Sequence, residues 1–112
     1  MRVNGAALLT EGQSTTFKFE VKTTVGLRSQ EGFVLCHHGN LLAFINECPH
    51  WAVELDLGDG HFYDPELDRI YCKNHGALFV LPNGECETGP CLGRSLTRLD
   101  LSVDGSDVVV LT

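Results

Sequence analysis

The sequence predicts an all-β protein, and two observations carry this prediction. Apolar residues alternate with polar ones or form short runs between turn signals, which is the pattern of strands and not of helices. The 12 glycines supply many turns between those runs. The 112 residues contain no helical stripe of useful length, no internal repeat and no linker, so we expect one domain over residues 1–112.

The clearest strand is predicted over residues 15–22, where three apolar side chains alternate with Lys and Glu. Residues 32–46 contain two apolar runs, one on each side of the turn HHGN. This pattern predicts a hairpin that ends just before Cys48. The segments LPNGEC and VDGSD predict later turns. Further strands are predicted over residues 69–72, 77–81, 95–103 and 107–111.

The charge balance limits the possible partners. The chain contains eight Lys and Arg and fifteen Asp and Glu, which give it a net charge of −7. A nucleic-acid binder needs basic surface, so we expect no such partner. The longest apolar runs, residues 41–45 and 108–111, are too short to cross a bilayer, and the first dozen residues lack the apolar core of a signal peptide. We therefore expect a cytoplasmic protein without a membrane partner.

The cysteines and histidines carry the chemistry. An odd number of cysteines, five, points to thiols or metal ligands more than to a disulfide framework. Cys48 and His50 form a CxH pair, Cys72 and His75 form a CxxH pair, and 21 residues separate the two. Each pair comes at the end of a predicted strand, and Gly76 follows the second. This context is typical of ligand-holding loops.

With these motifs the chain resembles the Rieske-type [2Fe-2S] ferredoxins, whose signature is CxH, a spacer, and CxxH followed by Gly. The resemblance covers nearly the whole chain and includes NGECETGPC, residues 83–91, which looks like the proline loop over the cluster. It implies a Rieske-like fold of antiparallel β-sheets with two cluster-binding loops and a proline loop. It also implies one [2Fe-2S] cluster per chain, with Cys48 and Cys72 on one iron and His50 and His75 on the other.

The mixed ligand set has a physical reason. Two ferric ions and two sulfides carry two positive charges, so two thiolates and two neutral imidazoles leave the oxidised site near neutrality. An added electron is then easier to accept than with four thiolates. Such ligation raises the potential from about −400 mV to a range of roughly −150 to +300 mV.

The position within that range depends on hydrogen bonds to the sulfurs. High-potential members of the resembled family carry a Ser after the His-Gly dipeptide and a Tyr two residues later, where this chain has Ala77 and Phe79. Those members also carry an additional, disulfide-linked Cys in each ligand loop, and this chain has no such pair. We therefore predict a low-potential centre.

Other interpretations of these residues stay open. The four ligands could hold tetrahedral zinc in an interaction module without redox function, or the thiols and imidazoles could be buried without metal. Cys86 and Cys91 could form a disulfide or a redox pair, or could pack as small buried side chains. Cys36 is expected in the core, and Trp51 could shield the cluster or fill the edge of the core. Three histidines are expected on solvated turns: His37, His38 and His61.

An acidic run lies between the ligand pairs. It contains no Lys or Arg among seven carboxylates, which are Glu47, Glu54, Asp56, Asp59, Asp64, Glu66 and Asp68. The run could be a solvated loop, or an acidic rim that steers a basic partner toward the cluster.

The expected function is a soluble one-electron carrier that passes electrons from a flavin reductase to a terminal oxygenase or other redox enzyme. We expect no catalytic activity of its own, because 112 residues leave no room for a second domain with a mononuclear iron, flavin or nicotinamide site. A monomer is expected. The alternative within the family is the small subunit of an NADH-dependent nitrite reductase.

Overall fold

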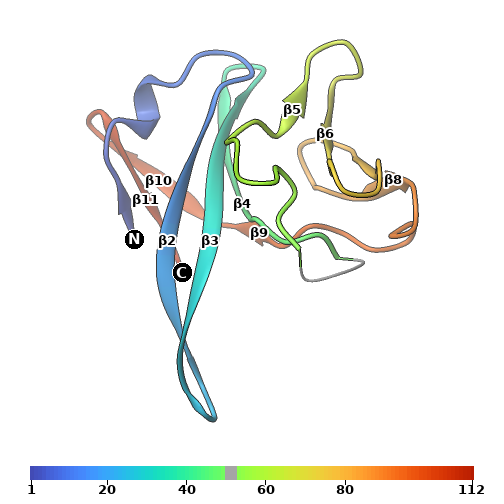
Figure 1. The fold of residues 1–112 in the computed structure, drawn as a ribbon. Coiled ribbons are helices and arrows are strands. Elements are labelled where there is room, and N and C mark those ends of the chain that lie inside the picture. Colours follow the sequence, from blue (N-terminus) through green and yellow to red (C-terminus); the bar gives the residue numbers. More distant parts are fainter. Residues whose placement is uncertain (50–52) are drawn as a thin grey trace.

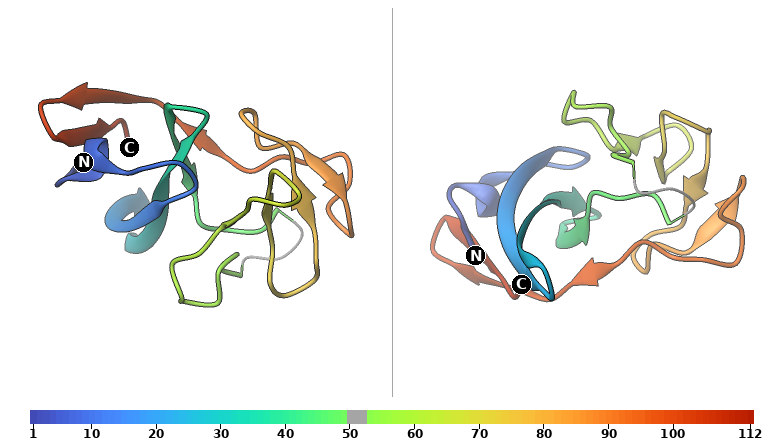
Figure 2. Two further views of the ribbon diagram at one scale, coloured as in Figure 1. Left: turned by 90° about the horizontal axis from the view of Figure 1, so that it is seen from above. Right: turned by 60° about the horizontal axis from the view of Figure 1, so that its bottom comes forward.

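The computed structural model describes residues 1–49 and 53–112, and its strands form three antiparallel sheets (Figure 1). The first sheet has the order β1-β11-β10, the second β2-β3-β4-β9 and the third β5-β6-β7-β8. Both views in Figure 2 place the second sheet between the first, which carries the chain termini, and the third. The all-β prediction is confirmed, and the helical content of the described residues is one 3-10 turn, η1 (Ala6–Leu8).

The second sheet contains the long strands β2 (Ser14–Thr23), β3 (Gly26–His37) and β4 (Asn40–Ile45), with the short β9 (Arg98–Leu99) beside β4. The predicted alternation in β2 is confirmed, because Phe17 is buried between exposed neighbours. Gly32 pairs with Phe17 across the strands, and a Cβ at Gly32 would lie 2.5 Å from the Phe17 ring. The missing side chain therefore makes room for the aromatic ring.

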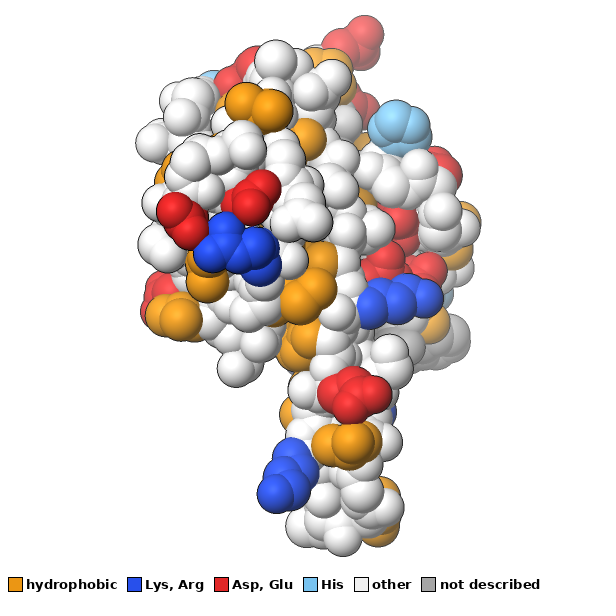
Figure 3. Space-filling model, turned by 90° about the vertical axis from the view of Figure 1, so that its left-hand side faces the viewer, with side chains coloured by type: hydrophobic (Ala, Val, Ile, Leu, Met, Phe, Trp, Pro, Cys, Tyr) orange, Lys and Arg blue, Asp and Glu red, His pale blue; other side chains and the backbone are white. Residues whose placement is uncertain are grey.

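The hairpin of β2 and β3 extends beyond the rest of the molecule. Figure 3 shows it projecting downward as an arm. At its tip Val25 is 96% exposed, and Leu27 is 67% exposed. The arm is held by its own ladder, which pairs every residue from Ser14↔Leu35 to Thr23↔Gly26.

The predicted hairpin around HHGN is confirmed by β3, β4 and the turn between them. One later prediction is wrong in detail. The segment 95–103 contains two strands in different sheets, because β9 pairs with β4 whereas β10 (Leu101–Asp104) pairs with β11 (Asp107–Val110). The short strand β1 (Arg2–Val3) joins the other edge of β11 and was not predicted, because two residues show no alternation.

The third sheet consists of four very short strands: β5 (Tyr63–Asp64), β6 (Arg69–Tyr71), β7 (Leu78–Phe79) and β8 (Cys86–Thr88). One buried core joins it to the second sheet. In this core the rings of Phe33 and Phe62 stack with centroids 3.8 Å apart and planes 6° from parallel. A second core lies on the side of the first sheet and includes Val34, Ala43 and Val108.

In the described part of the chain, no helix has the length and apolar character that a membrane crossing needs.

Replacing Phe62 by Ala should lower the free energy of unfolding by about 3–5 kcal/mol, the usual cost of removing a buried aromatic ring. Unfolding by urea, followed by circular dichroism, measures the change. Phe62→Leu should cost less, and Val25→Ala, at the exposed arm tip, should have almost no effect. Equal losses in the Phe62 and Val25 variants would show that the stack does not hold the two sheets together.

Candidate metal centre

The structure brings two of the predicted ligands together. Cys48 lies three residues beyond β4, and Cys72 directly follows β6, so the two thiols come from different sheets. Their exposed fractions are 1% and 0%. Burial raises the pKa of the Cys72 thiol, and Cys48, which is within hydrogen-bonding reach, raises it further. The two sulfurs therefore form a close, water-excluded pair.

The second ligand loop, residues 72–77, directs backbone donors at its sulfur. The Cys72 N–H donates to the carbonyl of Ala77 at 2.9 Å, and the Gly76 N–H donates to the carbonyl of Cys72 at 2.9 Å. Gly76 has a φ of +71°, which glycine adopts without strain. In this turn the N–H groups of His75 and Asn74 donate to the Cys72 sulfur, which lowers the thiol pKa against the effect of burial. The loop is thus built to stabilise negative charge on sulfur.

The first ligand loop, residues 48–53, is closed by a 2.9 Å bond from the Cys48 N–H to the carbonyl of Val53. His50 and Trp51 lie outside the described residues, so the expectations for both stay untested. The Lys73 N–H donates to the carbonyl of Leu55 at 2.9 Å and joins this part of the chain to the second ligand loop. His75 is exposed, and Cys72, three residues before it, is fully buried.

A buried polar clasp holds the chain on both sides of the first ligand loop. The side-chain oxygen of Asn46 accepts the N–H of Leu55 at 2.9 Å, and its amide donates to Asp56 at 3.1 Å. The second Asp56 oxygen accepts the N–H of Gly60 at 2.9 Å. Sequence reasoning missed Asn46, although a polar residue directly after an apolar strand and two positions before a ligand was a usable signal.

The third loop, residues 83–91, packs against the second ligand loop. A Cβ on Gly89 would lie 2.9 Å from the Cα of Ala77, and Gly89 has a φ of +106°, so this position requires glycine. Next to it Pro90 is exposed. Arg94, just beyond, donates from Nη1 to the carbonyl of Pro49 at 2.9 Å. Residues 83–94 therefore contact both ligand loops.

The remaining cysteines are buried free thiols, as expected of small core side chains. Burial, then the neighbouring Cys86 and more weakly Cys48, raise the pKa of Cys91 to about 12. A thiol with this pKa stays protonated at neutral pH, which makes it a poor nucleophile. Ala77 and Phe79, the positions that decide the expected potential, are both fully buried.

The acidic run is only partly a solvated rim. Asp56 is 2% exposed and belongs to the clasp, so both interpretations of the run are wrong for this residue. Asp59 forms an ion pair with Lys73, and Asp64 accepts the N–H groups of Glu66 and Leu67 at 2.9 and 3.2 Å. Glu54 is exposed next to the first ligand loop. Local hydrogen bonding thus accounts for much of the run.

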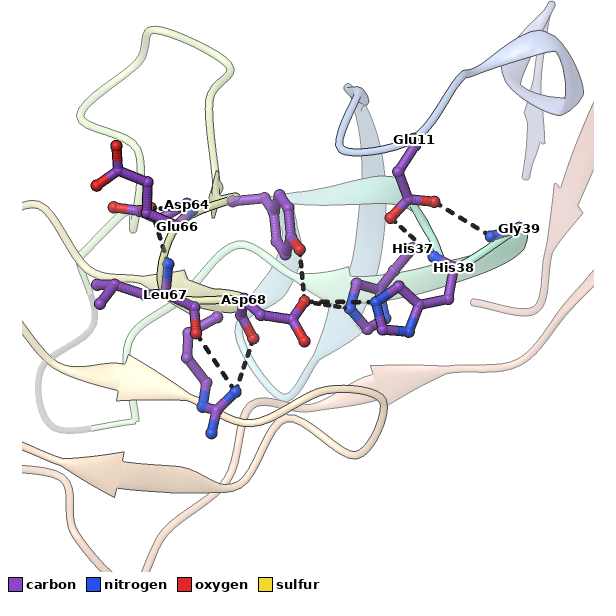
Figure 4. Close-up of polar contacts among 10 residues, drawn as sticks. Glu11, His37, His38, Gly39, Asp64, Glu66, Leu67 and Asp68 are labelled. Atoms are coloured by element: carbon purple, nitrogen blue, oxygen red, sulfur yellow. Dashed lines mark hydrogen bonds and ion pairs between the residues drawn. The ribbon is translucent and has the colours of Figure 1, made fainter.

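The prediction of a solvated turn is wrong for His37. Its side chain is buried at the end of β3, and its Nε2 lies 2.8 Å from Oδ1 of Asp68 (Figure 4). The turn prediction missed this contact because the partner lies 31 positions away along the chain. His38 and His61 are exposed, as expected.

Comparisons with known proteins agree with this geometry. The family model described as Rieske [2Fe-2S] domain matches residues 3–109. The ferredoxin of carbazole 1,9a-dioxygenase from Nocardioides aromaticivorans IC177 superposes with a TM-score of 0.70 and 25% identity, covering 98% of this chain and 94% of that chain. A search of curated protein sequences found no match.

Two further solved structures share the fold. A chain of the complex of reduced oxygenase and oxidised ferredoxin in carbazole 1,9a-dioxygenase has a TM-score of 0.70 and 22% identity, covering 99% of this chain and 100% of that chain. The ferredoxin of Sphingomonas yanoikuyae B1 has a TM-score of 0.65 and 20% identity, covering 98% of this chain and 95% of that chain. With the family model spanning residues 3–109, the chain belongs to the Rieske [2Fe-2S] family and is a ferredoxin-like electron carrier with a [2Fe-2S] cluster.

Proposed function

We propose that Cys48 and Cys72 bind one iron of the cluster through thiolates, and that His50 and His75 bind the other through imidazoles. The observation that carries this proposal is the buried pair of sulfurs, with two backbone N–H groups directed at Cys72. Thiolate ligands need such donors when they are withdrawn from water. The cluster, when bound, accepts and donates one electron at a time.

The protein supplies a fixed environment for this charge. The donors of the second ligand loop are set by its turn, so they need not rearrange when charge on the sulfur increases. Gly89 packs on Ala77, and neither Ala77 nor Phe79 offers a side-chain donor. We therefore place the reduction potential in the lower part of the Rieske range.

The exposure of His75 supports a docking surface over the tips of the ligand loops. Cys72 is completely buried and His75 is exposed, so a cluster held by these residues would have its His75 side nearer solvent. A partner that docks over the loop tips has the shortest path to the cluster. Pro90, also exposed, would form part of this contact.

The proposed partners are a flavin reductase as donor and a terminal oxygenase as acceptor. The resemblance to the ferredoxin of carbazole 1,9a-dioxygenase over 98% of this chain supports a role beside an oxygenase. The carrier would itself turn over no substrate and would act in the cytoplasm as a monomer.

Substitution of the ligands tests the metal site. Cys48→Ser, Cys72→Ser, His50→Ala and His75→Ala should each abolish or cripple cluster assembly, because each removes one bond to iron. Iron and acid-labile sulfide content, with two of each expected per cluster, provide the measurement. Cys91→Ala, a buried thiol near Cys48, is the matched control and should keep the cluster. Zinc in place of iron after anaerobic preparation would contradict the assignment.

Adding hydroxyls beside the cluster tests the assigned potential. Protein-film voltammetry should place the native potential at about −150 to 0 mV. Ala77→Ser and Phe79→Tyr should each raise it, because a donor to sulfur stabilises the added electron. Ala43→Ser, at a fully buried alanine of the second core, should leave it unchanged. A native potential well above about +100 mV would show that backbone donors to the sulfurs dominate.

Salt and charge changes test the docking surface. If the carboxylates that flank the first ligand loop steer the partner, added salt should slow second-order reduction by the flavin reductase. The double variant Glu47→Gln, Glu54→Gln should do the same, with an unchanged visible spectrum. Glu20→Gln removes a negative charge from the projecting arm and is the control, which should leave the rate unchanged. Stopped-flow rates that are indifferent to salt and to the double variant would remove the acidic residues from the contact.

A further inference from the structure

A second group of metal-ligating side chains lies where the β3–β4 turn meets the β5–β6 turn. His37 ends β3, His38 begins the turn to β4, and Asp68 directly precedes β6. The candidate ligand atoms of the three residues all lie within 4.8 Å of one another. Figure 4 shows both imidazole rings directed at the Asp68 carboxylate. Cys48 follows the opposite end of β4, so this group is separate from the proposed cluster ligands.

The two imidazoles converge on a single oxygen atom. Oδ1 of Asp68 lies 2.8 Å from Nε2 of His37 and 3.6 Å from Nε2 of His38. The rings are stacked, with centroids 3.8 Å apart and planes 22° from parallel. A hydrogen bond to the carboxylate accounts for the buried ring of His37. It does not require a second, exposed ring with its nitrogen turned to the same oxygen.

Neighbouring groups fix the carboxylate and the turn. The hydroxyl of Tyr63 donates to Oδ1 of Asp68 at 2.5 Å, and Nη1 of Arg69 donates to its backbone carbonyl at 2.9 Å. On the other side, the Glu11 carboxylate accepts the backbone N–H groups of His38 and Gly39 at 2.8 and 3.2 Å. Donors that orient a ligating carboxylate are typical of metal sites in proteins.

The spacing fits a small divalent metal ion. Ligand bonds of about 2.0–2.1 Å in a tetrahedral arrangement place ligand atoms about 3.3 Å apart. The 3.6 Å distance between Asp68 and His38 is close to this separation, and the 2.8 Å distance between Asp68 and His37 must increase slightly. His37 is held by burial, whereas the His38 side chain is 65% exposed and can turn to complete the arrangement.

A cavity beside the group leaves room for a fourth ligand. It has a volume of about 440 Å³ and is lined by His37, His38 and Asp68 together with Asn40 and Arg98, among others. Two imidazoles and one carboxylate suit zinc and its neighbours among the divalent ions, with water in the open position.

We propose that His37, His38 and Asp68 bind a divalent metal ion of the zinc class at the β3–β4 turn, with water as the fourth ligand. The bound metal would join the second sheet to the third at the start of β4, whereas Cys48 lies beyond the other end of this strand.

Calorimetric titration of the cluster-loaded protein with Zn²⁺ tests the proposal. One Zn²⁺ per chain should bind, and the visible spectrum should stay unchanged, which excludes exchange of zinc for iron. His38→Ala and Asp68→Asn should each weaken binding by more than about tenfold, since each removes a ligand or its charge. His61→Ala removes another exposed imidazole and is the matched control.

Thermal unfolding gives a second, independent measurement. Zn²⁺ should raise the unfolding midpoint of the native chain and of His61→Ala, because a ligand that binds the folded state stabilises it. The midpoint of His38→Ala, whose side chain is exposed and whose loss should not affect folding, should stay constant. Absence of Zn²⁺ binding, or binding that survives both His38→Ala and Asp68→Asn, would overturn the proposal and leave a hydrogen-bonded contact between two turns.

Discussion

Two sulfur atoms have to meet away from water, and much of the fold depends on this requirement. Cys48 follows a strand of the second sheet and Cys72 a strand of the third, so neither sheet forms the site alone. The stacked rings of Phe33 and Phe62 and the bond from Lys73 to the carbonyl of Leu55 hold the two parts together. Packing and redox chemistry are therefore not separable here, because the core that stabilises the protein also encloses the sulfurs.

The site is also asymmetric, and the asymmetry follows from burial. A charge on a buried sulfur is costly, and the backbone donors of the second ligand loop offset part of that cost. Toward the tip of the same loop the chain reaches solvent at His75. On the proposed ligand assignment, the buried half would control the reduction potential and the exposed half would give the electron a route to a partner.

Sequence patterns were sufficient where the relevant contacts are local. The alternation of β2 and the hairpin around HHGN were predicted because each depends on neighbouring residues. The short spacing of the CxH and CxxH pairs likewise predicts ligands, and for Cys48 and Cys72 the structure brings the two thiols together. The clasp between Asn46 and Asp56 and the burial of His37 were not predicted. His37 looked like a turn residue because its neighbours form a turn, but its side chain is placed by Asp68 in a distant part of the chain. The two- and three-residue strands of the third sheet are likewise defined by partners and not by their own pattern.

Those short strands have a consequence for the stability of the protein. The second sheet has a ten-residue and a twelve-residue strand, whereas no strand of the third sheet exceeds three residues. Such a sheet has few ladder bonds of its own, so iron that links loops from both sheets would act as a cross-link between them. Insertion of the cluster would therefore stabilise the third sheet as well as the two loops that hold it, and loss of the cluster would loosen this sheet before the long strands of the second.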